Sequence, residues 1–289
     1  MSDTIGGVAT SMGTVVAPAT AARRGRRRPR RLVGLVVPVV VLAAWQLAWT
    51  WEVKPPSILP SPHQVLSAAD AYFFGERVAT ELSGVVYFRG VGWSHLATSM
   101  GRCGQAWAAA VVVGLILGLG LGLSRWVADL LSPFANALRA VPLFAWLPLL
   151  SVWFGLNSTS GRILIFIGAL WPVVVATTDS VARVPAGQIE TARMLGTPRT
   201  RLWRRVYLPS ALPEIVTGLR LSLILAWTCV IIAELSGVTT GVGAMMTAGR
   251  ESNQTDRIIV GVFVFAVVGF AADALLRLLT RRFIRWSAT

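Results

Sequence analysis

Apolar residues in this chain gather into long runs, and short polar segments rich in arginine separate the runs. A helix of about 20 residues is about 30 Å long, which is the thickness of the hydrocarbon core of a bilayer. The runs therefore predict membrane-spanning helices at residues 32–51, 106–123, 134–155, 163–181, 215–235 and 258–279. We predict an all-α membrane protein with about six transmembrane helices.

The positions of the arginines predict how the chain is oriented. Arginine is concentrated in residues 23–31, in the polar segment 182–213 and near the C-terminus, whereas residues 52–95 and 237–257 carry nearly balanced charges. Because cytoplasmic loops carry an excess of Lys and Arg, both termini and the segment 182–213 are predicted to be cytoplasmic. Residues 1–31 are then a basic, disordered tail that anionic lipid headgroups attract, residues 52–95 an external segment and residues 237–257 an outer loop.

The composition excludes several classes of protein. Hydrophobic residues make up 54% of the 289 residues and charged residues only 14%, whereas about 25% of a soluble globular chain is charged. So few charges do not cover a soluble protein of this size, and so many apolar residues exclude a disordered chain. The formal net charge of +14 would suit nucleic acid, but the arginines lie between apolar runs, so no nucleic-acid partner is predicted.

The chain offers little material for catalysis or metal binding. His63 and His95 lie before the second predicted span, and Cys103 and Cys229 lie in apolar stretches with no CxxC spacing. Without a His/Cys cluster we predict no metal, no cofactor and no structural disulfide. A protease would need a histidine beside a nucleophile or a metal, and ATP hydrolysis would need a phosphate-binding loop of the GxxxxGK type, which the sequence lacks. We therefore predict that the chain is not an enzyme.

Proline and glycine positions predict local features of the spans. Pro142 and Pro148 lie inside the third predicted span, where prolines kink a helix and leave carbonyl groups without partners. Gly114, Gly118 and Gly122 recur every four residues in the second span. Small residues at that spacing let a neighbouring helix approach closely, so we predict tight helix packing on this face.

Some charged residues fall inside or at the ends of the predicted spans. Charges in a membrane are costly, and they usually face the interior of a helix bundle or a water-filled path. Arg220, Trp227 and Glu234 recur every seven residues, so they share one face of the fifth helix. With Arg139 they are the candidates for lining a translocation pathway or a dimer interface. Arg139 and Arg220 also lie near span ends, where long side chains can instead reach the membrane surface.

The polar segment 182–213 carries the most specific motif of the chain. The motif consists of Glu190, Thr191, Ala192, Gly196, Val206, Leu208 and Pro209. It resembles the loop of binding-protein-dependent ABC importer permeases, which reads Glu-Ala-Ala, three residues, Gly, nine residues, Ile, one residue, Leu-Pro. Thr191 and Val206 are conservative departures from it. In that family the loop is the coupling helix, which sits in a cleft of the ATPase subunit.

The same motif predicts two features of the backbone. Gly196 is expected to take the left-handed conformation that ends a short helix and turns the chain. Leu208 and Pro209 are expected to stop the next short helix before the fifth span begins.

The resemblance extends over residues 59–286 and is greatest to the permeases for nitrate, sulfonate, taurine and bicarbonate. It rests on the segments Leu59-Pro60-Ser61-Pro62, Arg139-Ala140-Val141-Pro142, Trp153-Phe154-Gly155, Gly218-Leu219-Arg220, Ala233-Glu234 and Gly241-Val242-Gly243. It implies a type I ABC importer permease fold in the bacterial cytoplasmic membrane. The permease core would occupy residues 96–286, and residues 287–289 would be a C-terminal end.

The resemblance also implies a function and partners. The chain would form the pathway for a small anionic solute such as a sulfonate, taurine or nitrate. Its partners would be a second permease copy, a pair of ABC ATPase subunits and an external substrate-binding protein. The alternative is a secondary transporter driven by an ion gradient, which would favour inverted repeats and protonatable residues in mid-span. No convincing repeat is visible, and Glu234 lies toward the outer end of its predicted span.

Overall fold

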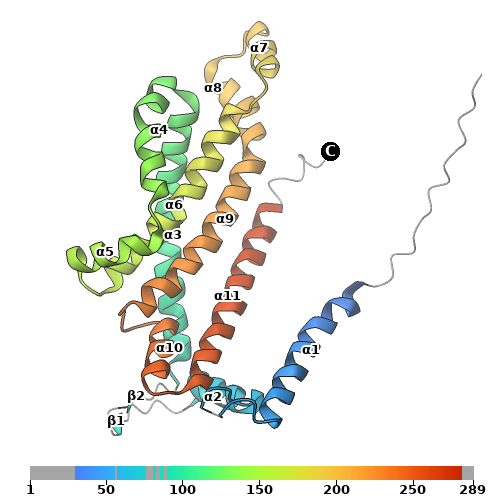
Figure 1. The fold of residues 1–289 in the computed structure, drawn as a ribbon. Coiled ribbons are helices and arrows are strands. Elements are labelled where there is room, and N and C mark those ends of the chain that lie inside the picture. Colours follow the sequence, from blue (N-terminus) through green and yellow to red (C-terminus); the bar gives the residue numbers. More distant parts are fainter. Residues whose placement is uncertain (1–29, 56, 76–80, 83–84, 87–89, 282–289) are drawn as a thin grey trace, which may run out of the picture. The chain divides into compact units, whose positions relative to one another are not determined.

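The computed structural model describes residues 30–55, 57–75, 81–82, 85–86 and 90–281 of the chain (Figure 1). Its α-helices are α1 (Arg30–Thr50), α2 (Pro62–Phe74), α3 (Gly92–Leu123), α4 (Arg125–Ala140), α5 (Trp146–Phe154), α6 (Ser158–Ala182), α7 (Ala186–Met194), α8 (Arg199–Leu202), α9 (Leu208–Leu235), α10 (Val242–Glu251) and α11 (Thr255–Arg281). The predictions for residues 1–29 and 287–289 lie outside the described residues.

Three shorter features complete the description. A 3-10 turn, η1 (Leu143–Ala145), precedes α5, and a π-helical turn, η2 (Trp203–Tyr207), joins α8 to α9. The strands β1 (Glu81–Leu82) and β2 (Val85–Val86) pair antiparallel. The chain divides into two compact units, Met1–Ala44 and Trp45–Thr289. The described part of the first unit belongs to α1, which covers nearly the residues predicted for the first helix.

Several helices of the described residues are long and apolar enough to cross a membrane. They are Gly92–Leu123, Ser158–Ala182, Thr200–Leu235 and Thr255–Thr280. Counting α4 and the segment Leu143–Phe154 as one bent span gives a fifth crossing, and Val36–Thr50 of α1 is a shorter apolar stretch within the residues whose side chains are described. The all-α prediction is confirmed, whereas six continuous helices of spanning length are not found in the described part of the chain.

The third predicted span, residues 134–155, is wrong as a continuous helix. α4 ends at Ala140, and the segment Leu143–Phe154 is bent by 85° from it. Between them Val141 has an extended backbone, with φ −72° and ψ 121°, because the ring of Pro142 disfavours a helical conformation in the residue before it. Pro142 also has no N–H to continue the helix. The predicted kink is therefore a complete break.

The second predicted span begins too late. α3 starts at Gly92 and not at residue 106, so the predicted boundary between an external segment and the permease core falls inside a helix. The first half of α3 contains Ser99 and Arg102, whose polarity disfavours a span in the sequence. Both side chains are buried and hydrogen-bonded within the protein, so their polarity does not oppose the helix.

The segment predicted as an outer loop, residues 237–257, contains the buried helix α10. Val242 and Met245 of α10 are completely buried, and the helix packs against α9 and α11. A helix this short cannot cross a bilayer, so the hydrophobic pattern by itself does not distinguish it from a loop. The prediction was wrong because only tertiary contacts cover this apolar run.

No helix ends at Leu208 and Pro209, which corrects the prediction for this site. The helical backbone continues from α8 through η2 into α9. Pro209 is the second residue of α9 and directly follows the π-helical turn η2, so its missing N–H falls where the regular hydrogen-bond pattern of the α-helix is already interrupted. Just before it, the N–H of Leu208 donates to the carbonyl of Trp203, five residues back, as a π-helical turn requires.

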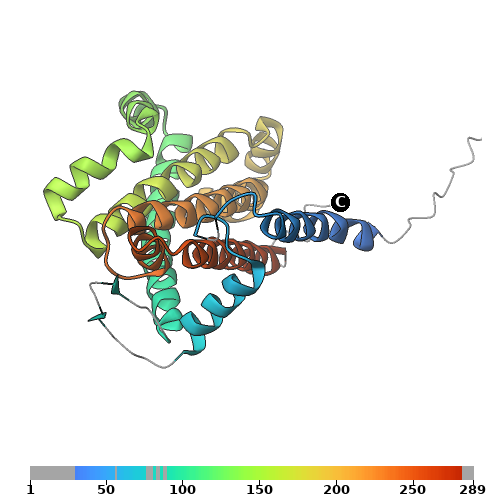
Figure 2. The ribbon, with the colours of Figure 1, turned by 60° about the horizontal axis from the view of Figure 1, so that its bottom comes forward.

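α3, α6 and α9 pack against one another at the centre of the second unit (Figures 1 and 2). Gly114, Gly118 and Gly122 of α3 face α6, as predicted. A Cβ at Gly114 would lie 2.8 Å from the Cβ of Val173, and one at Gly118 would lie 2.6 Å from the Cβ of Thr177. In Figure 1, α7 and α8 lie at one end of these helices, the α7 end, and α2 and α10 at the opposite end, the α10 end.

Candidate functional site

The segment 182–213 folds into α7, α8 and the start of α9, with a tight turn after α7. Gly196 has a φ of +69°, its N–H donates to the carbonyl of Arg193 over 2.9 Å, and the N–H of Thr197 donates to the carbonyl of Ala192 over 3.1 Å. These two bonds form a Schellman motif, which satisfies the last carbonyls of the helix. The predicted left-handed conformation of Gly196 is confirmed.

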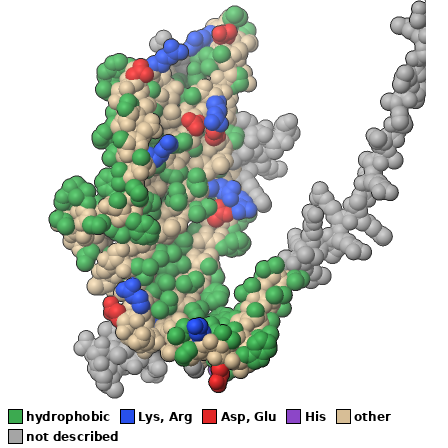
Figure 3. Space-filling view, viewed as in Figure 1, with side chains coloured by type: hydrophobic (Ala, Val, Ile, Leu, Met, Phe, Trp, Pro, Cys, Tyr) green, Lys and Arg blue, Asp and Glu red, His purple; other side chains and the backbone are tan. Residues whose placement is uncertain are grey.

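This turn leaves two large apolar side chains uncovered. Met194 is 86% exposed and Leu195 is 79% exposed. Lys and Arg side chains, with some acidic ones, lie at the α7 end of the molecule (Figure 3). The exposed arginines of the loop are Arg193, Arg201, Arg204 and Arg205. Exposed apolar residues with a polar rim are typical of a surface that binds another protein.

The remaining motif residues lie in the same loop. Glu190 is exposed on α7, and the hydroxyl of Thr191 donates to the carbonyl of Gly187 over 2.8 Å. Val206 lies in η2, and Leu208 is partly exposed at the start of α9. α7 packs against α8, which leads through η2 to the second half of the motif.

Ion pairs connect α6 and α9 beneath this loop. One guanidinium nitrogen of Arg183 lies 3.0 Å from Glu214, and the other lies 3.5 Å from Asp179. The side chain of Arg183 is largely exposed, so each pair contributes about 1 kcal/mol at most. These pairs orient the ends of two long helices at the point where the loop leaves them.

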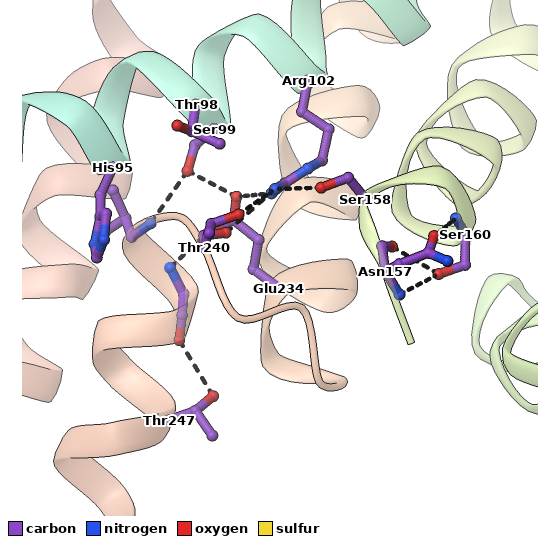
Figure 4. Close-up of polar contacts among 12 residues, drawn as sticks. His95, Thr98, Ser99, Arg102, Asn157, Ser158, Ser160, Glu234, Thr240 and Thr247 are labelled. Carbon is purple, nitrogen blue, oxygen red and sulfur yellow. Dashed lines mark hydrogen bonds and ion pairs between the residues drawn. The ribbon is translucent and has the colours of Figure 1, made fainter. Parts of the chain in front are cut away.

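A charged cluster at the α10 end is enclosed by the protein (Figure 4). Glu234 of α9 is 0% exposed, Arg102 of α3 is 4% exposed, and the two form an ion pair. Glu234 also accepts hydrogen bonds from the hydroxyl of Ser99 at 2.7 Å and from the N–H of Gly243 at 2.8 Å. Arg102 donates to the carbonyl of Thr240 at 3.2 Å. The cluster therefore ties α3 and α9 to the loop before α10 and to its first turn.

The same cluster caps the N-terminus of α10. The N–H of Val242 donates to the hydroxyl of Ser99 over 3.1 Å, and the N–H of Gly243 donates to Glu234. The first N–H groups of a helix have no partner within it, and a negative charge is favourable there. A Cβ at Gly243 would lie 2.5 Å from the Cβ of Glu234, so only glycine lets the two approach. Each group in the cluster has a partner, which makes it a structural feature and not a ligand site.

The predicted face of α9 turns toward the interior of the chain. Glu234 lies in the buried cluster, and the indole N–H of Trp227 donates to the carbonyl of Phe265 over 2.9 Å. Arg220 lies 3.0 Å from Asp273 of α11. The three residues do share a face, as their spacing predicts. In this structure that face holds α9 against its neighbours, and Trp227 and Glu234 are buried within the chain.

Arg102 is the residue that the sequence predictions missed. The available signal is an arginine within an apolar helix, since a charge there needs a partner.

Near the cluster, the hydroxyl of Tyr72 and Nδ1 of His95 share a hydrogen bond of 3.0 Å. Burial, together with the charge of Glu234, raises the pKa of Tyr72 far above its ordinary value. Tyr72 therefore stays protonated at physiological pH.

Arg139 has a different environment from the other candidates. It lies in the last turn of α4, its side chain is exposed, and it forms no ion pair or hydrogen bond within the described residues. With Ser132 and Asn136 it borders a hollow of about 210 Å³ between α4 and the helices α3 and α6. Arg139 is thus the candidate that faces open space.

The described residues offer few other side-chain groups for metal binding or catalysis. No group of three or more His, Cys, Asp or Glu side chains that could hold a metal ion is found there. Cys103 and Cys229 are both free and buried. The α7 turn and the hollow beside Arg139 are two features of the described chain with capacity to bind a partner or a solute.

Comparison with known proteins places the chain in a family. The family described as "Binding-protein-dependent transport system inner membrane component" matches residues 110–285. The putative aliphatic sulfonates transport permease protein SsuC of Bacillus subtilis is 34% identical over 96% of this chain and 96% of its own length. The taurine transport system permease protein TauC of Escherichia coli is 36% identical over 86% of each chain. The nitrate import permease protein NrtB of Synechocystis is 30% identical over 89% of this chain and 94% of its own.

Solved structures of transporters share the fold. The crystal structure of an amino acid ABC transporter with histidines matches with a TM-score of 0.54 and 22% identity, over 68% of this chain and 93% of the other. An inward-facing MetNI methionine ABC transporter matches with a TM-score of 0.52 and 20% identity, over 66% of this chain and 98% of the other.

Permeases of the binding-protein-dependent transport family work with ATPase subunits and a substrate-binding protein. The chain therefore belongs to the inner membrane components of binding-protein-dependent transport systems, and it is a multi-pass permease of the ABC importers and not an enzyme.

Proposed function

We propose that this permease carries a small anion into the cell and that α7 is the helix through which ATP hydrolysis drives it. The observation that carries the proposal is the exposed apolar pair Met194 and Leu195, held on the rigid turn at Gly196. Fully burying a side chain of this size on a partner is worth about 1.5–3 kcal/mol. The pair is therefore suited to insertion into a groove of the ATPase subunit.

The charges around the apolar pair define the partner further. The exposed arginines Arg193, Arg201, Arg204 and Arg205 lie in the same loop as the pair, and Glu190 is the acidic residue of the motif. Complementary potentials steer partners together and fix their register. We expect the ATPase groove to have an apolar floor and an acidic rim.

The proposed solute follows from the relatives. Two relatives of 34% and 36% identity are named as transporters of aliphatic sulfonates and taurine, and one of 30% identity is named for nitrate import. Sulfonates and nitrate are anions, and taurine carries a sulfonate group. An external binding protein would deliver the anion, and the permease would let it pass.

The pathway would lie between two copies of this chain, each bound to one ATPase subunit of a pair. α4, η1 and α5 leave large apolar side chains uncovered in the single chain, which a second copy and membrane lipid together would cover. These side chains are Phe134, Phe144, Val152 and Trp153. Native mass spectrometry of the transporter should find two copies of the permease with two ATPase subunits.

The coupling role is tested by placing a charge on the apolar pair. The permease, the ATPase and the binding protein that its host expresses with it are reconstituted in liposomes, and uptake of labelled sulfonate is measured with and without ATP. We expect Met194→Glu to lower ATP-driven uptake at least tenfold, because a carboxylate at the centre of the contact must be desolvated. Gln188→Glu adds the same charge to an exposed position of α7 and should leave uptake near the wild-type level.

Two outcomes would contradict the proposal. One is wild-type uptake by the Met194→Glu variant at an equal amount in the membrane. The other is uptake that needs an ion gradient and no ATP, which would favour a secondary transporter.

A further inference from the structure

α4 carries a polar stripe in a segment that otherwise counts toward a membrane span. Ser132, Asn136 and Arg139 are spaced by four and three residues, so they lie on one face of the helix. Within the described chain none of these three side chains has a hydrogen bond or an ion pair. A guanidinium that faces hydrocarbon is costly, so such a residue faces a water-filled space or a binding partner. The stripe therefore marks a site whose partner the chain itself does not supply.

The hollow next to the stripe favours an anion. The guanidinium of Arg139, the amide of Asn136 and the hydroxyl of Ser132 can all donate hydrogen bonds. On the opposite wall, the hydroxyl of Thr178 already donates to the carbonyl of Gly118 at 3.2 Å, so its oxygen is free only to accept. A planar guanidinium with neighbouring donors is the arrangement that holds carboxylates, phosphates and similar oxyanions.

The negative charge near this hollow is already compensated. Asp179 of α6 also borders it, but Asp179 lies 3.5 Å from Arg183. Arg139 has no such carboxylate among the described residues. The net potential at the Arg139 side of the hollow is therefore positive, which suits a solute with one negative charge.

An apolar hollow of about 290 Å³ adjoins the polar one. The two hollows share a border of four residues, Leu121, Ala135, Trp171 and Val174. The rest of the apolar hollow is lined only by hydrophobic side chains, among them Leu138 and Trp146. Nitrate and bicarbonate have no apolar part to place there, whereas an alkyl chain would gain from burial.

We propose that these two hollows form one binding site for an oxyanion with a short aliphatic tail, such as an alkanesulfonate. The sulfonate lies at Arg139, Asn136 and Ser132, and the tail lies against Leu138 and Trp171. Pockets for drug-sized ligands span about 300–1,000 Å³, so hollows of about 290 and 210 Å³ admit a small solute and not a lipid with two acyl chains. This inference rests on the proposed function, because it assigns the transported solute to this site.

The test measures binding to the full-length permease in nanodiscs of phosphatidylcholine. Radiolabelled butanesulfonate is the probe, and methanesulfonate and nitrate compete with it. We expect butanesulfonate to bind most tightly and nitrate least. Arg139→Gln should weaken binding of each anion at least tenfold. Arg220→Gln removes an arginine whose partner is Asp273 and should leave binding unchanged.

A second variant tests the apolar half of the site. Leu138→Ser should weaken butanesulfonate several-fold and leave methanesulfonate unchanged, because only the longer tail reaches Leu138. Equal affinity of the wild type and the Arg139→Gln variant for butanesulfonate would overturn the proposal. So would displacement of the probe by phosphatidylglycerol in the nanodisc, since the site would then hold a lipid headgroup. Binding here needs no ATPase, so a negative result leaves the outcome of the Met194→Glu uptake experiment intact.

Discussion

Met194 and Leu195 at the α7 end are 86% and 79% exposed, whereas Arg102 and Glu234 at the α10 end are 4% and 0% exposed. Apolar side chains are thus uncovered at one end of the helices, and charges are buried at the other. The apolar pair lacks contacts that another protein could supply. The ion pair has its contacts within the chain, from Ser99 to the first turn of α10.

The difference teaches how each end relates to stability and to transport. Burying charges is unfavourable unless each has a partner, so removing one partner leaves the other charge unpaired in the interior. Exposed apolar side chains contribute little to the stability of the isolated chain, so changing them affects binding instead. The α10 end should therefore respond to mutation in stability and the α7 end in coupling.

The largest expected effect comes from breaking the buried pair. Glu234→Ala should destabilise the protein by about 3–5 kcal/mol, because Arg102 stays buried without its partner. Thermal unfolding of the purified permease in detergent measures this effect. The double variant Arg102→Met with Glu234→Met should recover most of the loss, since it removes both charges together. A loss below about 1 kcal/mol for the single variant would mean that the pair is worth no more than a surface pair.

A smaller effect on stability but a large one on transport is expected at Gly196. Nothing lies within 4 Å of a Cβ at this position, so an aspartate side chain fits without a clash. The Gly196→Asp substitution should therefore lower stability only through the strain of the left-handed backbone, by about 2 kcal/mol at most. The added charge beside Met194 should lower ATP-driven uptake at least tenfold. Gly196→Asn is the matched control, because asparagine tolerates this conformation and carries no charge. Equal uptake by the Asp and Asn variants would show that the charge is irrelevant to coupling.

The smallest effect is expected at Arg220. Its side chain is 35% exposed in its pair with Asp273, and Asp273 also keeps an ion pair with Arg277 at 2.5 Å. Arg220→Gln should therefore reduce stability by about 1 kcal/mol at most and leave uptake unchanged. Lower uptake at unchanged stability would favour the prediction that this face of α9 lines the pathway.

Local rules account for the features that the sequence predicted correctly. The left-handed turn at Gly196 follows from glycine after a short helix, and the close approach of α3 and α6 follows from glycines four residues apart. The prediction for Leu208 and Pro209 was wrong because a proline that follows a π-helical turn is compatible with a continuing helix, as well as with the end of one. The sequence offers no local sign that distinguishes the two cases.

By itself the sequence determined the all-helical class, the polar loop between two long helices and the motif within it, because apolar runs and residue spacing act over a few helical turns. Only the tertiary structure decided that Arg102 and Glu234, 132 residues apart, form one cluster and that α10 is buried. It also decided which way the shared face of Arg220, Trp227 and Glu234 turns. Periodicity places residues on one face of a helix, but what covers that face depends on contacts between distant segments.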